Sequence, residues 1–270
     1  MEKLKSKITN LITNYRLPNT DYRIPILLPT AHGRRTTNYL LALGSAAYLL
    51  LAANSFAFTN YVWSGGSENP PYDSWANAAK SIQLAVDYAV EGNVVLVTND
   101  VYTVSGHILI TTNNIILKSV NGAANTVING NSTTHCIYLR GDSIIDGFSI
   151  INGKFSNGGG IFVQNYGTIL NCIFTNNFAT ISDGGAIRAR DALVSNCYFY
   201  ANGAKNGGGV FMRYGSFVKD CVFENNIATN GGAIYCYGAN AGTISDCVIS
   251  NNNAYDGGGL WLTNNSIVSS

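Results

Sequence analysis

Aromatic and arginine side chains recur at one position of a repeated phrase. The phrase is a glycine pair followed by a small and an aliphatic residue, and the next position holds Phe162, Arg188, Phe211, Tyr235 and Trp261. Two residues further on lie Gln164, Arg190, Arg213, Tyr237 and Thr263. Aromatic rings and guanidinium groups are suited to sugar rings and acidic groups. The candidates for contact with a glycan, an acidic polysaccharide especially, are Phe162, Arg188, Arg190, Phe211, Arg213, Tyr235, Tyr237 and Trp261.

The same row also has a purely structural explanation. Aromatic pairs on neighbouring strands stabilise sheets without any ligand. Another segment of the chain or a second subunit could cover such a row. Both interpretations stay open on the sequence alone.

Carboxylates and histidines give little support for catalysis. A polysaccharide lyase needs clustered carboxylates for calcium and a basic side chain for proton abstraction, and a glycoside hydrolase needs paired carboxylates. Here the carboxylates are scattered, mostly at turn positions, and neither His107 nor His135 has an evident acid or nucleophile partner. The one charge cluster, Asp183, Arg188, Arg190 and Asp191, reads as a solvated face. We assign no catalytic residue, no metal site and no cofactor.

Six cysteines, an even number, raise the question of disulfides: Cys136, Cys172, Cys197, Cys221, Cys236 and Cys247. Four of them, at 172, 197, 221 and 247, occupy one position of a repeat. A free cysteine packs well as a small hydrophobic residue, so we predict a ladder of buried thiols. Disulfides and a bound metal are the alternatives, although no C-x-x-C pair is present.

Two phrases repeat in step over the second half of the chain. The glycine phrase begins at residues 158, 184, 207, 231 and 257, which gives steps of 26, 23, 24 and 26 residues, and Asn or Asp precedes it each time. The cysteine phrase runs Cys-x-Phe or Cys-x-Ile and ends three residues later in Asn177, Asn202, Asn226 or Asn252. We predict that these asparagines form a hydrogen-bonded ladder between equivalent turns.

Units of about 24 residues with short apolar alternations predict a solenoid of β-strands. Such a unit cannot bury its own apolar face, but stacked units can. The alternation predicts an inward column of residue pairs: Ile161/Val163, Ile187/Ala189, Val210/Met212, Ile234/Cys236 and Leu260/Leu262. Because strand side chains alternate with period two, the aromatic and arginine row would face outward.

The glycine and cysteine phrases resemble the repeats of bacterial β-helix surface proteins. The chlamydial polymorphic outer-membrane proteins use both phrases, and residues 127–130 and 145–148 resemble the opening coils of the pectin-lyase-like superfamily. The resemblance covers about residues 61–270. It implies an all-β, right-handed parallel β-helix (β-solenoid). It leaves activity open, since that superfamily contains lyases, hydrolases and adhesins.

Composition excludes several classes of protein. With only 16 Lys+Arg and 15 Asp+Glu but 29 Gly, the chain does not suit a coiled coil or helical bundle, and 46% apolar residues exclude general disorder. A net charge of +1 gives no indication of nucleic-acid binding.

We predict three regions along the chain. Residues 1–57 combine basic residues, an apolar run and small residues before a cleavage site, which is typical of a signal peptide or, if uncleaved, a membrane anchor. Residues 58–93 form an N-terminal cap with a short amphipathic helix over 73–90, with Ser74 as its N-cap and Gly92 beyond its end. Coils begin at Val94 and run to residue 270. Val268 matches the residue three before a repeat cysteine, so we expect further coils to be missing.

These features predict a secreted or cell-surface scaffold, more suited to adhesion or glycan binding than to catalysis. The alternatives are a carbohydrate-active enzyme, namely a polysaccharide lyase or glycoside hydrolase of the pectin-lyase-like fold, and an autotransporter passenger. The expected partner is a polysaccharide or cell-surface glycan. Contact with a membrane is expected only through the N-terminal apolar segment or a missing C-terminal anchor.

Overall fold

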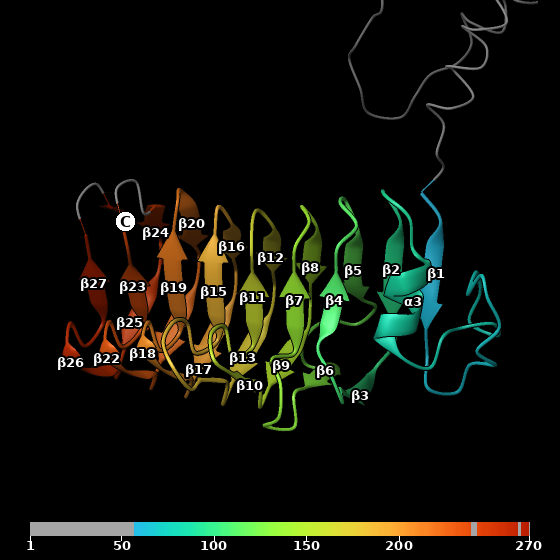
Figure 1. The fold of residues 1–270 in the computed structure, drawn as a ribbon, viewed down its shortest axis with the longest axis horizontal. Coiled ribbons are helices and arrows are strands. Elements are labelled where there is room, and N and C mark those ends of the chain that lie inside the picture. The colour runs from blue at the N-terminus through green and yellow to red at the C-terminus, as the bar shows by residue number, and fades with distance from the viewer. Residues whose placement is uncertain (1–56, 239–241, 264–265, 270) are drawn as a thin grey trace, which may run out of the picture. The chain divides into compact units, whose positions relative to one another are not determined.

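The computed structural model describes residues 57–238, 242–263 and 266–269. Within them the chain winds into coils whose strands stack in parallel along one axis, from β1 at one end to β27 at the other (Figure 1). The prediction of an all-β parallel solenoid is confirmed. The predicted export segment lies outside the described residues, except for Ala57 at its end.

From β8 onward each coil passes through four sheets, which we name A, B, D and C in chain order, whereas the coils before it pass through A, B and C alone among the described residues. Sheet A comprises β1 (Thr59–Val62), β2 (Val94–Val97), β5 (Ile116–Ser119), β8 (Ile144–Asp146), β12 (Thr168–Leu170), β16 (Leu193–Ser195), β20 (Ser216–Lys219), β24 (Gly242–Ser245) and β28 (Ile267–Ser269). Sheet B comprises β3 (Asp100–Thr103), β6 (Thr126–Asn129), β9 (Ser149–Ile151), β13 (Ile173–Thr175), β17 (Tyr198–Tyr200), β21 (Val222–Glu224) and β25 (Val248–Ser250).

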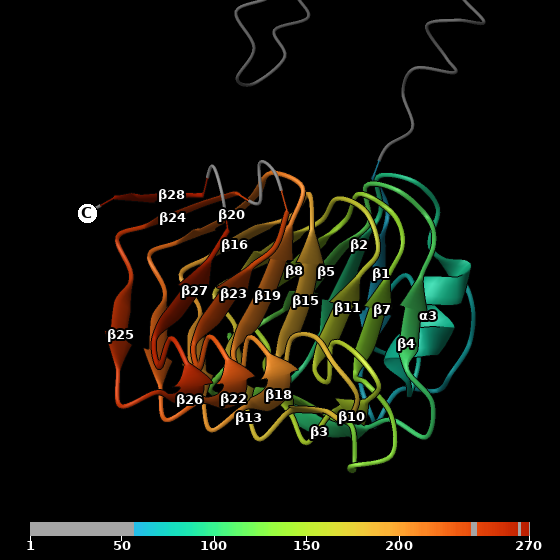
Figure 2. The same ribbon diagram turned by 60° about the vertical axis from the view of Figure 1, so that its left-hand side comes forward.

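The two remaining sheets complete the coil. Sheet D, seen apart from sheet C in Figure 2, comprises β10 (Lys154–Phe155), β14 (Phe178–Ala179), β18 (Gly203–Asn206), β22 (Ile227–Asn230) and β26 (Asn253–Asp256). Sheet C comprises β4 (Ile108–Ile110), β7 (Ile137–Leu139), β11 (Ile161–Val163), β15 (Ile187–Arg190), β19 (Val210–Arg213), β23 (Ile234–Cys236) and β27 (Leu260–Leu262). The last five strands of sheet C, β11 to β27, begin at the aliphatic residue of each glycine phrase.

The interior is a set of columns of apolar side chains. Phe174, Phe199 and Phe223 stack with ring centroids 4.9 and 4.5 Å apart and nearly parallel planes. The predicted inward pairs of β11, β15, β19 and β23 are buried, whereas Leu260 is half-buried and Leu262 exposed in the last described coil. Burial of one such side chain stabilises the fold by about 2 kcal/mol, so the columns hold the coils in register.

The asparagine ladder is confirmed, and so is the ladder of buried thiols at Cys172, Cys197 and Cys221, whereas Cys247 is only half-buried. The cysteines are free thiols, and the backbone N–H of Cys172 donates to Sγ of Cys197 at 3.4 Å. At the asparagine position, the backbone N–H of Asn202 and its Nδ2 both donate to Oδ1 of Asn226 at 3.0 Å. Side chains thereby replace ladder hydrogen bonds where the chain turns from sheet B towards sheet D.

The two glycines of each phrase are required for different structural reasons. Gly207 has a φ of 65°, a left-handed conformation that glycine adopts without strain. Gly208 instead lies against the next coil, and a Cβ there would collide with the carbonyl group of Gly232. Close stacking at this corner therefore requires the second glycine.

The predicted helix is shorter than the sequence indicates. Helix α3 spans Ile82–Tyr88, with Ser81 rather than Ser74 as its N-cap. The chain before it cannot be helical because Ala79 bonds β1: its N–H donates to Tyr61 O, and its carbonyl accepts from the N–H of Trp63, both at 2.9 Å. The helix ends at Tyr88 with Ala89 as its C-cap, so Gly92 lies beyond it as expected.

The helix lies beside β4, the first strand of sheet C (Figure 1). The side-chain amide of Gln83 bonds the free edge of that strand: Nε2 donates to Leu109 O at 3.2 Å, and Oε1 accepts from Leu109 N at 2.7 Å.

We expected coils from Val94, but β1 pairs in parallel with β2, so sheet A starts one strand earlier. In the described part of the chain, no helix has the length and apolar character needed to cross a bilayer.

Candidate binding face on sheet C

The outward side chains of sheet C form one continuous row. Its strands pair in register, with Phe162 beside Arg188, Arg188 beside Phe211, Phe211 beside Tyr235, and Tyr235 beside Trp261. A second row lies next to it, in which Arg190 pairs with Arg213. The structure thus brings together the eight residues selected from the sequence, and we call their surface the sheet C face.

Stacking between neighbouring coils orders the row. Tyr235 stacks on Trp261 with centroids 4.3 Å apart and on Phe211 at 5.4 Å. The guanidinium of Arg188 lies over the rings of Phe162 and Phe211, at 4.8 and 5.9 Å from their centroids. These contacts fix side chains that would otherwise lose rotamer freedom on binding a ligand.

Exposure differs along the row. Phe211 and Tyr235 are only 3% and 8% exposed, because their neighbours cover their faces, whereas Tyr237 is 48% exposed. Trp261 and the three arginines are half-buried. A ligand would therefore meet Tyr237, Trp261 and the arginines, while Phe211 and Tyr235 support them from below.

The face carries an excess of positive charge. Arg188 Nε lies 3.8 Å from Asp183 Oδ2, and burial lowers the pKa of Arg188 in spite of that carboxylate. Arg213 packs over the rings of Tyr214 and Tyr237, and Arg190 packs over Tyr214. Nε of Arg190 is buried without a hydrogen-bond partner among the described residues.

A small hollow opens in this face. It has a volume of about 170 Å³, and its walls are Asp183, Asn206, Phe211, Arg213, Tyr235 and Tyr237. Asn206 Nδ2 donates to Asp183 Oδ1 at 3.0 Å, which fixes the carboxylate at the rim. In this hollow a carboxylate and a guanidinium could hold hydroxyl and acidic groups while the tyrosines contact a ring face.

Sequence reasoning missed one member of the row. Tyr138 lies in register beside Phe162, with ring centroids 5.1 Å apart, and its hydroxyl donates to Gln164 Oε1 at 2.9 Å. No glycine phrase precedes β7, so the phrase used to find the row did not mark this coil. The alternation of Ile137, Tyr138 and Leu139 was the available signal.

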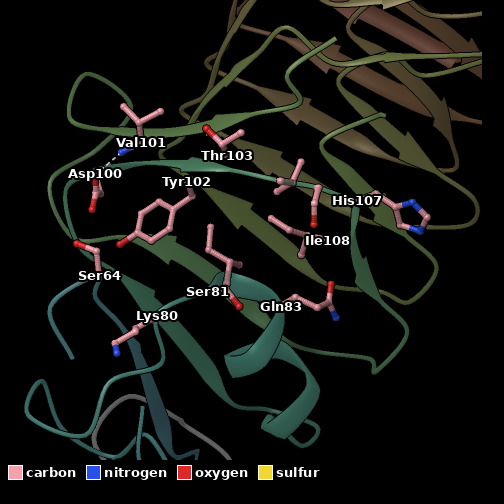
Figure 3. A pocket seen from close by; sticks show the side chains of 14 residues that line it. Ser64, Lys80, Ser81, Gln83, Asp100, Val101, Tyr102, Thr103, His107 and Ile108 are labelled. Carbon is pink, nitrogen blue, oxygen red and sulfur yellow. Dashed lines mark hydrogen bonds between the residues drawn. The ribbon is translucent and has the colours of Figure 1, made fainter. Parts of the chain in front are cut away.

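A larger hollow lies outside the predicted face, where α3 stands in place of a strand (Figure 3). It encloses about 350 Å³ between the start of α3 and residues 100–108, and its walls include Lys80, Asp100, Tyr102 and His107. The Tyr102 hydroxyl already bonds Thr98, and Asp100 accepts from the N–H of Val101. Tyr102 and Asp100 therefore have partners within the chain, and the hollow lacks the aromatic row of the sheet C face.

Two histidines meet near this hollow. The rings of His107 and His135 lie 4.5 Å apart between centroids. Burial lowers the pKa of His135 to about 4, with a smaller contribution from His107, and burial also lowers the pKa of His107. The sequence separation of 28 residues gave no sign that they would meet.

The comparisons with known proteins bear on the fold alone. The family described as "Right handed beta helix region" matches residues 135–270, about half of the chain. No curated protein and no solved structure matches. The closer resemblance to pectin-lyase-like and chlamydial repeats stays a prediction. From the stacked parallel sheets and this match together, we conclude that the chain belongs to the right-handed β-helix family.

Proposed function

We propose that the protein is a secreted or cell-surface scaffold whose sheet C face binds an acidic polysaccharide without cleaving it. The observation that carries this proposal is the in-register row of aromatic and arginine side chains across five successive coils. Export is supported by the basic and apolar pattern of residues 1–57.

The spacing of the row suits a linear polymer. Parallel strands lie about 4.8 Å apart, which is near the rise of one sugar unit in an extended glycan. Equivalent side chains on successive coils could therefore contact successive sugars. Rigid aromatic faces and planar guanidinium groups provide such contacts at a low entropic cost.

The charge of the face selects an acidic ligand. Arg188, Arg190 and Arg213 lie on adjacent coils, and Asp183 is the carboxylate within 4 Å of one of them in the described chain. Carboxylate or sulfate groups of a glycan would offset the remaining positive charge.

The test is a binding titration of the full chain with an oligogalacturonate and with a neutral oligosaccharide of equal length. We expect saturable binding of the acidic glycan alone. Replacing the exposed ring in Tyr237→Ala, or the charge in Arg213→Gln, should weaken binding about tenfold, since each removes a contact worth about 1–2 kcal/mol.

Lys219→Gln is the matched control. It removes one exposed positive charge on sheet A, away from the sheet C face, and should leave binding unchanged. Equal weakening by Lys219→Gln and Arg213→Gln would show that only net charge matters, and it would refute a specific face. Shortening of the glycan during the titration would favour the alternative of a polysaccharide lyase or hydrolase.

A further inference from the structure

His107 and His135 come from successive coils and meet at the start of sheet C. His107 directly precedes β4, His135 lies two residues before β7, and the two strands pair in register with Ile108 beside Ile137. The planes of the two imidazoles are inclined by 43°. Apart from His32, which lies outside the described residues, these are the histidines of the chain.

The imidazole of His135 is buried without any hydrogen bond. The residue is 3% exposed, and neither Nδ1 nor Nε2 has a partner within the described part of the protein. Phe155 and Tyr138 pack edge-to-face with the ring, with centroids 4.5 and 5.7 Å away. Aromatic packing covers the ring but provides no ordinary acceptor or donor, and a buried polar group in that state calls for a bound ion or water.

We propose that His107 and His135 together bind a divalent transition metal ion, with Cu²⁺ or Ni²⁺ favoured over Zn²⁺. An ion about 2.0 Å from one nitrogen of each ring would lie roughly 3.2 Å from each ring centroid. With the centroids 4.5 Å apart, the two directions enclose an angle of about 90°. That is the angle between neighbouring ligands in the tetragonal geometry typical of Cu²⁺ and Ni²⁺, and it is smaller than the tetrahedral angle of Zn²⁺ sites.

Water can supply the remaining ligands. His107 is half-buried and borders the 350 Å³ hollow, and its ring lies at the margin of that hollow, away from Tyr102 and Asp100 (Figure 3). An ion can therefore reach His107 from solvent. The adjacent thiol of Cys136 does not take part, because its Sγ donates to the carbonyls of Ile128 and Ile151.

Arg140 limits the affinity of this site. Its guanidinium lies 5.0 Å from the ring centroid of Tyr138 and acts electrostatically on His107. A fixed positive charge so close opposes a second cation. Removing that charge should therefore raise the affinity for the metal ion, whereas replacing either histidine should lower it.

The test uses the full chain without a histidine tag, freed of metal with a chelator and titrated calorimetrically with Ni²⁺. We expect one ion per chain. His107→Asn and His135→Asn should each weaken binding at least about tenfold, and Arg140→Gln should strengthen it several-fold. His32→Asn is the matched control and should bind as the unaltered chain does. Electron paramagnetic resonance with Cu²⁺ should show coupling to two imidazole nitrogens.

Several results would overturn the proposal. These are undiminished binding by His107→Asn, loss of binding in His32→Asn alone, or a Cu²⁺ spectrum without two nitrogen couplings. Circular dichroism checks that each variant is folded. If His135→Asn unfolds because its ring is buried, His107→Asn decides the question, since that ring is half-buried and makes no hydrogen bond to the residues that the structure describes.

Discussion

Asn177 donates two hydrogen bonds to the same oxygen of Asn202 in the next coil. Its backbone N–H and its Nδ2 both lie 3.0 Å from Oδ1 of Asn202, and Asn202 repeats the arrangement with Asn226. The Nδ2 group of Asn202 also donates to the carbonyl of Phe174 at 3.0 Å. The side chain of Asn202 thus satisfies two backbone groups of the preceding coil at a buried corner.

Asn202→Ala should therefore destabilise the protein strongly. The change leaves the backbone N–H of Asn177 and the carbonyl of Phe174 without their partner at a position that is 0% exposed. At about 1–3 kcal/mol for each buried group left unsatisfied, we expect a loss of about 3–5 kcal/mol in the free energy of unfolding. Urea denaturation followed by circular dichroism measures it.

Asn121→Ala is the matched control for the ladder. Asn121 is exposed and donates to Asn99 Oδ1 at 2.8 Å, so solvent can replace that bond. We expect a change within about 0.5 kcal/mol. If Asn202→Ala and Asn121→Ala lost equal stability, the asparagine ladder would not be what stabilises the turn between sheets B and D.

Gly208→Ala should be nearly as harmful, for a steric reason. The added Cβ would collide with the carbonyl of Gly232 and contact Ile227, so neighbouring coils must separate. We expect a loss of about 3 kcal/mol or a fall in soluble yield. Gly106→Ala is the comparison, because a Cβ there has open space and the backbone has no positive φ. A tolerated Gly208→Ala would contradict the close stacking of coils.

The buried thiols of Cys136, Cys197 and Cys236 should be chemically inert in the folded protein. Burial raises the pKa of the Cys136 thiol to about 12 and that of Cys236 to about 11, and it raises the pKa of Cys197 as well. Since the thiolate is the reactive form, these groups should react with a water-soluble disulfide reagent only after unfolding. A thiol titration with and without denaturant checks this. Rapid reaction of Cys136, Cys197 and Cys236 in the native state would contradict the burial.

The repeat made the middle of the molecule predictable from sequence. Period-two alternation sets which side of a strand is buried, so Ile161 and Phe162 could be assigned to opposite faces. The same repeat also fixed the register of the row, because equivalent positions in stacked coils must lie side by side.

Non-repeating parts were harder to predict. Tyr138 was missed because its coil lacks the glycine phrase, and the start of α3 was placed too early because Ala79 bonds β1, a contact that no local pattern reveals. The meeting of His107 and His135 depends on a coil length that only the fold defines. The near burial of Tyr235 follows from stacking between coils, which alternation alone does not quantify.

Gln83→Ala should open the first edge of sheet C without unfolding the solenoid. Gln83 bonds both the N–H and the carbonyl of Leu109, so its amide takes the place of a neighbouring strand. Two partly buried hydrogen bonds are lost, and we expect a loss of about 1–3 kcal/mol together with faster hydrogen exchange at the Leu109 amide. Asp87→Ala is the control, because it removes the exposed bond from Gln83 Nε2 to Asp87 while leaving the edge covered. Unchanged exchange at Leu109 in Gln83→Ala would mean that the body of the helix, and not this side chain, protects the strand.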